Sequence, residues 1–373
     1  MKPLIKWAGG KSNEIRYIKK MIPKFDRYIE PFFGGGALFF DLEPKKAIIN
    51  DISFELIELY RLIKDNRFRN RFKKEMYNYV EAWERINDYI ETFGNNFINL
   101  YKEYRAGLIT IEKFEEKINK LFLDKIIPFN GLFKEKFCID QGDLLEKITN
   151  NLILKLKRTK EKIDTNNNFS DIEIMKNVES AFRSGFYIHF RKIMNLAKTK
   201  KINISNEKRI ANWYFIREFC YGGMFRFNSS GEFNVPYGGI GYNKKDFRGK
   251  VDNLFSKQVV NLMINTKIEN KDFEIILNSN LTKDDFIFLD PPYDSEFSDY
   301  EENSFTKKDQ ERLSKTLINL KAKWILIIKE TPFIFNLYNN KKGVKISKFD
   351  KNYSFQIRSR INTKVKHLII HNL

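Results

Sequence analysis

Short apolar runs with no alternation of polar residues mark both ends of the chain. Three of them, Ala47 to Asn50, Phe286 to Leu289 and Trp324 to Ile328, are largely aliphatic or aromatic, and a shorter one, Tyr28 to Glu30, enters a glycine turn. Strands that are apolar at successive positions are typical of a parallel sheet covered on both faces. The two ends of the chain therefore predict strands of one parallel sheet.

Helical periodicity separates these runs. After the second run, apolar residues recur at helical spacing, namely Ile52, Leu56, Leu59, Tyr60 and Ile63. Thr306 can cap a further helix with Asp309 three residues on. Two last apolar runs, Val344 to Phe349 and Val365 to Ile370, flank a basic loop and predict a hairpin that closes the sheet. Strands and helices that alternate in this way predict an α/β fold.

The middle of the chain carries a different pattern. Between Asn66 and Asn212 the residues Lys, Glu, Asn, Phe and Ile recur with helical periodicity, and the clearest predicted helices are Glu75 to Tyr104 and Glu112 to Leu123. The polar stretch Thr165 to Ser170 predicts a surface loop. We therefore expect a mostly helical segment inserted within the α/β domain.

Composition narrows the range of partners. The 373 residues include 67 Lys and Arg against 48 Asp and Glu, a formal charge of +19, which makes nucleic acid the leading partner, ahead of an anionic membrane surface. An AT-rich genome would also raise the lysine content, so charge alone leaves the partner open. The two cysteines, Cys138 and Cys220, lie far apart, which favours a reducing cytosol over a disulfide framework.

Metal and membrane classes are not expected. No cysteine and histidine cluster has zinc-ligand spacing, so we expect no metal. His367 and His371 lie four residues apart, but the run around them is strand-like, and we expect ordinary strand residues there. Met1 to Ile5 lacks a signal-peptide pattern, and no apolar run reaches about 18 residues. We expect a soluble, cytoplasmic protein with no membrane partner.

The run DFIFLDPPYDSEF places chemistry at the carboxyl end of a predicted strand, which is where open α/β sheets bind ligands. Asp290 and the carbonyl of Pro291 can accept the hydrogens of a planar amine such as that of adenine, while Pro291 and Pro292 stiffen the backbone. Tyr293 supplies a ring on which an extruded base can stack. A proline-stiffened strand exit would have the same four letters, so this motif needs support from elsewhere.

The run EPFFGGGALFFDL, which begins at Glu30, supplies that support. Gly34, Gly35 and Gly36 let the backbone approach a ligand closely and begin a helix tightly. Asp51 follows Gly36 by fifteen residues and ends the next predicted strand, where an acidic side chain can bind a ribose diol. No basic residue lies within this turn, so a sulfonium nucleoside is favoured over a pyrophosphate dinucleotide.

Two further segments carry candidate contacts. KWAGGKS, Lys6 to Ser12, lacks the first glycine of a phosphate loop, and we expect its backbone amides and Lys11 to hold a carboxylate while Trp7 packs over the ligand. In REFCYGGMFRFNSSGEFNVPYGG, the stretch Asn228 to Gly231 predicts the turn of a protruding hairpin. Arg226 can contact a guanine edge and Tyr221 can wedge between bases, although a solvated surface hairpin would have the same sequence.

In chain order, KWAGGK, EPFFGGG, IIND, YGGMFRFNSSGEFNVPYGG, DPPY and NSFTKKDQERL resemble the Dam-like DNA adenine methyltransferases, over roughly Met1 to Asn66 and Glu218 to Leu373. The resemblance implies a Rossmann-like S-adenosylmethionine-dependent methyltransferase sheet with a reversed last strand. It implies a catalytic domain formed by residues 1–65 and 265–373. The rest, 66–264, would be an inserted helical target-recognition domain with a DNA-contacting hairpin near 217–239.

The resemblance also implies roles for individual residues. Those expected at S-adenosylmethionine are Trp7, Lys11, Pro31, Phe32, Gly34, Asp51 and Asp290. Those expected at the reacting amine are Asp290, Pro291, Pro292 and Tyr293. Those expected on DNA are Tyr221, Arg226 and Asn228. The expected reaction is methyl transfer to N6 of a flipped adenine in duplex DNA, by a monomer or weak dimer that serves restriction-modification beside a cognate endonuclease, or epigenetic marking.

Two departures from the family affect the target sequence. The insertion 66–212 is longer than in compact members, and Gly222 stands where relatives often carry asparagine, so a GATC target is an expectation from the family alone. Other reactions stay open, namely methylation of adenosine in RNA, of cytosine in DNA or of a glutamine side chain. Asp290 favours adenine, because cytosine enzymes tend to carry serine there and glutamine enzymes asparagine. A DNA-binding protein that has lost catalysis is the alternative of a different class.

Overall fold

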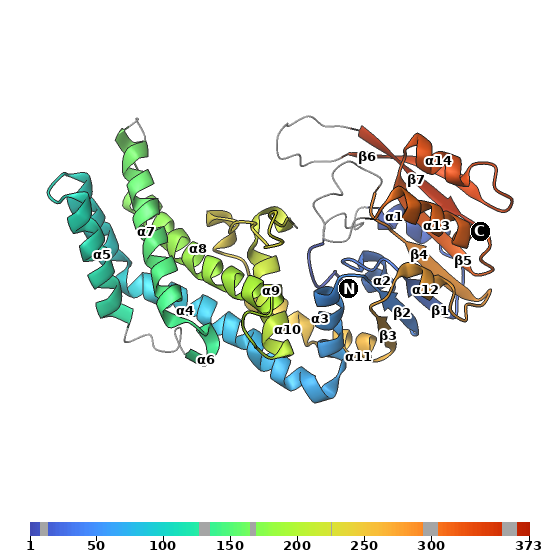
Figure 1. Ribbon diagram of the computed structural model, residues 1–373, viewed down its shortest axis with the longest axis horizontal. Helices are drawn as coiled ribbons and strands as arrows, with labels where there is room; N and C mark the ends of the chain where they lie inside the picture. The colour runs from blue at the N-terminus through green and yellow to red at the C-terminus, as the bar shows by residue number, and fades with distance from the viewer. Residues whose placement is uncertain (8–13, 127–134, 165–168, 225, 294–304, 353–363) are drawn as a thin grey trace. The chain divides into compact units, whose positions relative to one another are not determined.

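The computed structural model in Figure 1 describes residues 1–7, 14–126, 135–164, 169–224, 226–293, 305–352 and 364–373. The chain divides into two compact units. Unit 1 comprises Met1–Asn66, Phe225–Gly231 and Leu254–Leu373, and unit 2 comprises Arg67–Met224 and Glu232–Asn253. Within the described ranges, no helix is long and apolar enough to cross a membrane.

Unit 1 is built on a seven-stranded sheet (Figure 1). Its strands are β1 Arg27–Glu30, β2 Ala47–Asn50, β3 Thr266–Glu269, β4 Asp285–Leu289, β5 Lys323–Lys329, β6 Lys345–Asn352 and β7 Lys364–His371. They lie in the order β3-β2-β1-β4-β5-β7-β6. The first five are parallel to one another, and β7 runs antiparallel to both β5 and β6. The predicted Rossmann-like sheet with a reversed strand and a closing hairpin is therefore confirmed.

Helices precede or separate the strands of unit 1 along the chain. Those described are α1 Ile15–Ile18, α2 Ala37–Leu42, α3 Phe54–Lys64, α11 Lys257–Ile264, α12 Phe273–Leu277, α13 Lys307–Ile318 and α14 Pro332–Tyr338, with a 3-10 turn at Lys19–Met21. At the start of α13, the backbone N–H of Asp309 donates to the hydroxyl of Thr306, and the Asp309 carboxylate accepts from the Thr306 N–H at 2.9 Å. The predicted cap of this helix is thus present.

Both faces of the sheet are covered, which explains the unbroken apolar runs. On one face, Tyr28 of β1 packs against Phe286 of β4 and Phe39 of α2, with ring centroids 6.0 and 6.2 Å apart. The intervening residues Ile29 and Ile287 are fully buried in a cluster that α12, α13 and α14 complete. Successive strand residues point to opposite faces, so apolar residues are needed at successive positions along the middle of these strands.

Unit 2 is mainly helical. Its helices, two of which reach one residue beyond the unit, are α4 Asn66–Arg105, α5 Ile111–Ile126, α6 Glu135–Cys138, α7 Gln141–Asp164, α8 Asp171–Lys198, α9 Asn206–Phe219 and α10 Phe247–Leu254, with 3-10 turns at Tyr221–Gly223 and Ile240–Tyr242. The helices predicted over 75–104 and 112–123 lie within α4 and α5. Of the predicted loop, residues 165–168 lie outside the described ranges, and Ser170 caps α8 by accepting from the N–H of Glu173.

Candidate active site

The loop after β1 is a tight glycine turn beneath Trp7. Gly34 and Gly36 have φ angles of +48° and +63°, in the left-handed region that favours glycine. A Cβ atom on Gly34 would lie 2.9 Å from Cδ1 of Trp7, and one on Gly36 would lie 2.3 Å from Cζ of Phe33. Both positions therefore require glycine, and Trp7 can pack directly on the turn. Lys11, expected beside Trp7, lies outside the described residues.

The carboxylate of Asp51, just after β2, faces this turn. One of its oxygens accepts a hydrogen bond from the backbone N–H of Gly34 at 2.8 Å, and the other accepts from the N–H of Ser53 at 2.9 Å. Two backbone donors thus fix the side chain beside the glycine turn. The structure brings Trp7, Gly34 and Asp51 together, as the sequence motifs suggested.

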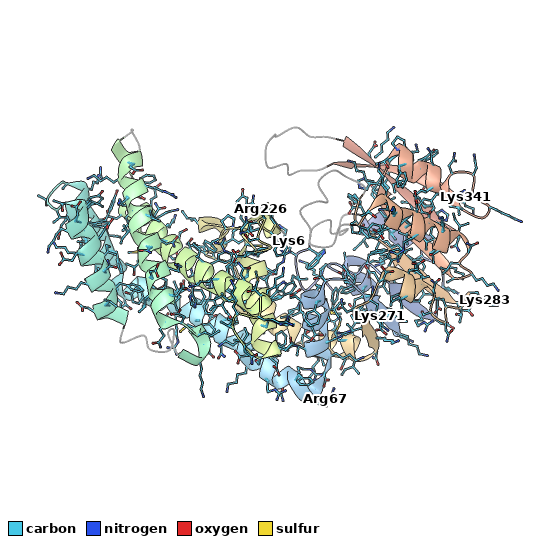
Figure 2. The ribbon with its side chains drawn as sticks, in the orientation of Figure 1. Lys6, Arg67, Arg226, Lys271, Lys283 and Lys341 are labelled. Atoms are coloured by element: carbon cyan, nitrogen blue, oxygen red, sulfur yellow. The ribbon has the colours of Figure 1, made fainter. Side chains whose placement is uncertain are left out.

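Asn50 joins the loops around this turn through hydrogen bonds, although it was not predicted as a site residue. Its side chain is 1% exposed and donates to the carbonyls of Pro31 at 2.9 Å and Lys271 at 3.0 Å, while its oxygen accepts from the Lys271 N–H at 2.9 Å. Lys271, labelled in Figure 2, follows β3. The side-chain amide of Asn50 therefore joins the loops after β1, β2 and β3. In the sequence, Asn50 was marked only as a polar residue at the end of an apolar run.

Phe32, expected in the donor pocket, belongs to a cluster of three aromatic rings. Its ring centroid lies 5.3 Å from that of Phe273 on α12 and 5.4 Å from that of Phe305, which meets it edge to face. Phe273 and Phe305 are 5.5 Å apart. The neighbouring Pro31 is buried. These contacts hold the start of the glycine loop against the segment that leads into α13.

The DPPY motif follows β4 directly and is held by contacts with two other elements, α13 and β7. Its side chains are half-buried except for one that is buried, Pro291. The carbonyl of Pro292 accepts a hydrogen bond of 2.9 Å from Nε2 of Gln310 on α13. The hydroxyl of Tyr293 lies 3.2 Å from Nε2 of His367 on β7. Neither Gln310 nor His367 was identified from the sequence.

Glu30 ends β1, between the strands that lead to Asp51 and Asp290. Its carboxyl group is 2% exposed and accepts a hydrogen bond of 2.9 Å from the hydroxyl of Tyr28. Burial raises the pKa of Glu30 well above its ordinary value; the hydrogen bond from Tyr28 opposes this rise, and the charges of Asp290 and Asp51 add to it. Burial and the two acidic side chains thus favour the protonated form of Glu30, a residue that the sequence motifs did not mark as part of the site.

The loop between α9 and α10 carries the residues expected on DNA. An antiparallel bridge joins Cys220 to Tyr237. Further along, Asn228 accepts from the N–H of Ser230 at 3.0 Å through its side chain and from the N–H of Gly231 at 2.9 Å through its carbonyl. The predicted turn is present, but the described residues of this loop form isolated bridges instead of the regular strands of a hairpin.

The three side chains expected to contact DNA are all at least partly exposed within the units to which they belong. Tyr221 is 42% exposed, Arg226 is exposed (Figure 2), and Asn228 is half-buried. Gly222, beside Tyr221, has a φ of +63°, and its N–H donates to the hydroxyl of Tyr242 at 3.1 Å. Asparagine is among the side chains that best tolerate a left-handed φ, so the backbone explains how glycine can stand where asparagine is common in the family.

Both cysteines are buried and free of disulfides. Burial is the largest influence on Cys220, and it raises the pKa of the thiol. Across the described ranges, no three His, Cys, Asp or Glu side chains form a metal-binding group.

Comparison with known proteins agrees with this geometry. A family model described as D12 class N6 adenine-specific DNA methyltransferase matches residues 7–138 and 142–355. The chain is similar to the type II methyltransferase M.CviBI of Paramecium bursaria Chlorella virus NC1A, with 25% identity over 100% of both chains. It is similar to the type II methyltransferase M.MjaIII of Methanocaldococcus jannaschii, with 27% identity over 84% of this chain and 78% of the relative.

A third relative has a higher sequence identity over a shorter stretch of the chain. A DNA adenine methylase of Haemophilus influenzae is 33% identical over 132 residues, which cover 35% of this chain and 42% of the relative. The family model, by contrast, extends over most of the chain and through residues of both units. The chain therefore belongs to the D12 class N6 adenine-specific DNA methyltransferases.

Proposed function

We propose that this enzyme methylates N6 of an adenine flipped out of duplex DNA, with Asp290, Pro291, Pro292 and Tyr293 at the reacting amine. The observation that carries this assignment is the meeting of the glycine turn, Asp51 and the DPPY motif at the carboxyl ends of adjacent strands. β1 lies between β2 and β4 in the sheet, and ligands of open α/β sheets bind where the strand order reverses in this way.

The methyl donor of this family is S-adenosylmethionine, and the residues around the glycine turn suit it. A Cβ atom on Gly34 would clash with Trp7, so glycine at this position lets the indole, which we expect to pack over the donor, lie directly on the turn. Asp51 is fixed by two backbone donors, and a carboxylate at the end of this strand is the group that a ribose diol would donate to. Pro31 and Phe32 would line the same pocket. Lys11 is proposed as a partner of the donor carboxylate on the sequence pattern alone.

The reacting groups follow from the chemistry of the amine. When bound, S-adenosylmethionine supplies an electrophilic methyl group on a sulfonium centre. The lone pair of the adenine amine is delocalised into the ring, so Asp290 and the carbonyl of Pro291 would accept its two hydrogens and favour a more tetrahedral nitrogen. The half-buried ring of Tyr293 would stack on the extruded base. The raised pKa of Glu30 disfavours a third negative charge beside Asp290.

Recognition of DNA is assigned to the loop between α9 and α10. The exposed guanidinium of Arg226 would make a bidentate contact to a guanine edge, and Tyr221 would insert beside the target base. Asn228 shapes the turn through its hydrogen bonds and would contact the backbone of DNA. The formal charge of +19 favours association with a polyanion at long range. Relatives named as type II methyltransferases support a place in restriction-modification beside a cognate endonuclease.

The test of this assignment is Asp290→Ala, because that change removes the proposed acceptor from a half-buried position. We expect methyl transfer to DNA to fall by roughly 10² to 10³-fold or more, while DNA binding measured by gel shift stays within about twofold. Asp284→Ala is the matched control, since Asp284 is exposed at the opposite end of the same strand and should leave both measurements unchanged. Appreciable transfer by Asp290→Ala would remove the carboxylate from the mechanism.

A further inference from the structure

His367 is a fully buried side chain on β7 whose ring faces the tyrosine of the DPPY motif. The hydroxyl of Tyr293 and Nε2 of His367 are 3.2 Å apart. Their ring centroids are 5.5 Å apart with an interplanar angle of 67°, an edge-to-face arrangement. The contact is therefore both a hydrogen bond and an aromatic packing contact.

The position of His367 itself is fixed by the sheet. In the strand register, His367 pairs with Lys329 of β5 on one side and with Phe349 of β6 on the other. The ring of Phe349 lies 5.6 Å from the imidazole and 5.6 Å from the ring of Tyr17. His367 is 0% exposed. A side chain confined in this way is a rigid anchor for whatever it contacts.

The backbone of the motif is anchored separately. Gln310, which is 0% exposed, donates to the carbonyl of Pro292 at 2.9 Å, so α13 holds the chain one residue before Tyr293. The bonds of the tyrosine side chain still leave its ring free to tilt about that fixed point. A second contact at the far end of the ring removes this freedom, and His367 supplies it.

We propose that His367 is a positioning residue that holds the ring of Tyr293 at the angle needed to stack on the flipped base. This inference rests on the proposed role of Tyr293. The reversed strand β7 thereby contributes to base binding although none of its residues belongs to a recognised motif. Holding the ring before the base arrives reduces the conformational freedom that is lost on binding.

The test is a double-mutant cycle of His367→Leu and Tyr293→Phe. Each change removes the same hydrogen bond, and Tyr293→Phe keeps the stacking ring. We expect either variant to lower kcat/KM for unmethylated genomic DNA by about fivefold to tenfold, with KM for S-adenosylmethionine within about twofold of the parent. The double variant should be no worse than either single one, and His367→Gln, whose amide can reach the hydroxyl, should recover part of the loss.

A fluorescent base reports the proposed step directly. In a duplex with 2-aminopurine at the mapped target adenine, we expect His367→Leu to reduce the fluorescence rise on binding, whereas His371→Leu should not. His371 is the matched control, because it lies on the same strand and its Nδ1 accepts from the N–H of Leu373 at 3.2 Å. Thermal unfolding of each variant separates a positioning effect from a loss of folding.

Three results would overturn the proposal. First, His367→Leu could match the parent in kcat/KM. Second, the loss of kcat/KM caused by His367→Leu could persist in the Tyr293→Phe background. Third, Tyr293→Phe alone could be fully active, which would decide the matter even if His367→Leu fails to fold. Failure of the proposed function looks different. In that case, Tyr293→Ala, which removes the stacking ring altogether, would leave methyl transfer and the 2-aminopurine signal unchanged.

Discussion

At the scale of single residues, the site depends on keeping three carboxyl groups close together. Glu30, Asp51 and Asp290 end or follow adjacent strands, and the charges of the latter two raise the pKa of Glu30 beyond the rise that burial causes. The proton retained by Glu30 relieves repulsion that three carboxylates would otherwise exert on one another. Ionisation of Glu30 should therefore destabilise this arrangement.

This predicts how stability changes with pH. Glu30 keeps its proton in the folded state at pH values where the unfolded chain has released it, so unfolding releases a proton and stability falls as pH rises from the ordinary carboxyl pKa of 4.5 towards the folded value. The slope is at most about 1.4 kcal/mol per pH unit. Glu30→Gln, which cannot ionise, should lack this loss.

The measurement is the melting temperature of the parent and of Glu30→Gln from about pH 5 to pH 9 in the absence of donor. We expect the parent to lose stability relative to the variant as pH rises. Glu43→Gln serves as a control, because the pKa of that half-buried carboxyl is lowered, chiefly by its hydrogen bond with the chain's amino terminus. A difference between the parent and Glu30→Gln that stays constant with pH would show that Glu30 ionises normally.

Some of these residues could be predicted from the sequence, and others could not. Gly34, Asp51 and Asp290 stand within short motifs whose chemistry is local. Gln310 and His367 were not predicted as site residues because their partners in the DPPY motif lie 18 and 74 residues away along the chain. No local sequence pattern records such a separation. Lys11, predicted on local pattern, lies outside the described residues.

At the scale of elements, the helices α7 and α8 depend on a close approach. Gly185 faces the α7 backbone, where a Cβ atom would lie 2.4 Å from Cα of Ile148 and 2.6 Å from the carbonyl oxygen of Lys147. Backbone atoms cannot move aside as a flexible side chain can. The glycine therefore sets the distance between the two helices.

Gly185→Ala should destabilise the protein by about 1 to 3 kcal/mol through this overlap. The sign is informative, because in an unobstructed helix the same change would stabilise by about 1 kcal/mol. Ser184→Ala, at the neighbouring half-buried position, should change stability by less than about 0.5 kcal/mol. Chemical denaturation of all three proteins measures these differences, and a Gly185→Ala variant as stable as the parent would contradict the packing described here.

Element boundaries were less predictable than element types. α4 begins at Asn66, earlier than the predicted Glu75, because its first turns are basic and carry few apolar residues. There Arg67 and Arg71 lie over the ring of Phe68, contacts that hydrophobic periodicity does not register. α9 likewise extends through Arg217, whose guanidinium donates to the carbonyls of Gly223 and Met224. The loop after α9 contains no regular strand among its described residues, which differs from the hairpin predicted from local sequence.

At the scale of the whole molecule, the order of the strands accounts for the site. The sequence predicted every strand of the sheet except β3, but not that these strands would lie in the order β3-β2-β1-β4. That order brings together loops separated by more than 200 residues, as the contact of Asn50 with Lys271 illustrates. The resemblance to a known family implied a Rossmann-like sheet with a reversed last strand, but connectivity is not encoded in the period of a hydrophobic pattern.

The most direct test of the central claim is the identity of the methylated nucleoside. Purified protein is incubated with S-adenosylmethionine carrying a labelled methyl group and with either duplex DNA or RNA of the same sequence, and the products are digested to nucleosides. We predict label in N6-methyldeoxyadenosine from the DNA reaction, with none formed by Asp290→Ala. Label in methylated cytosine, or in RNA alone, would contradict the account.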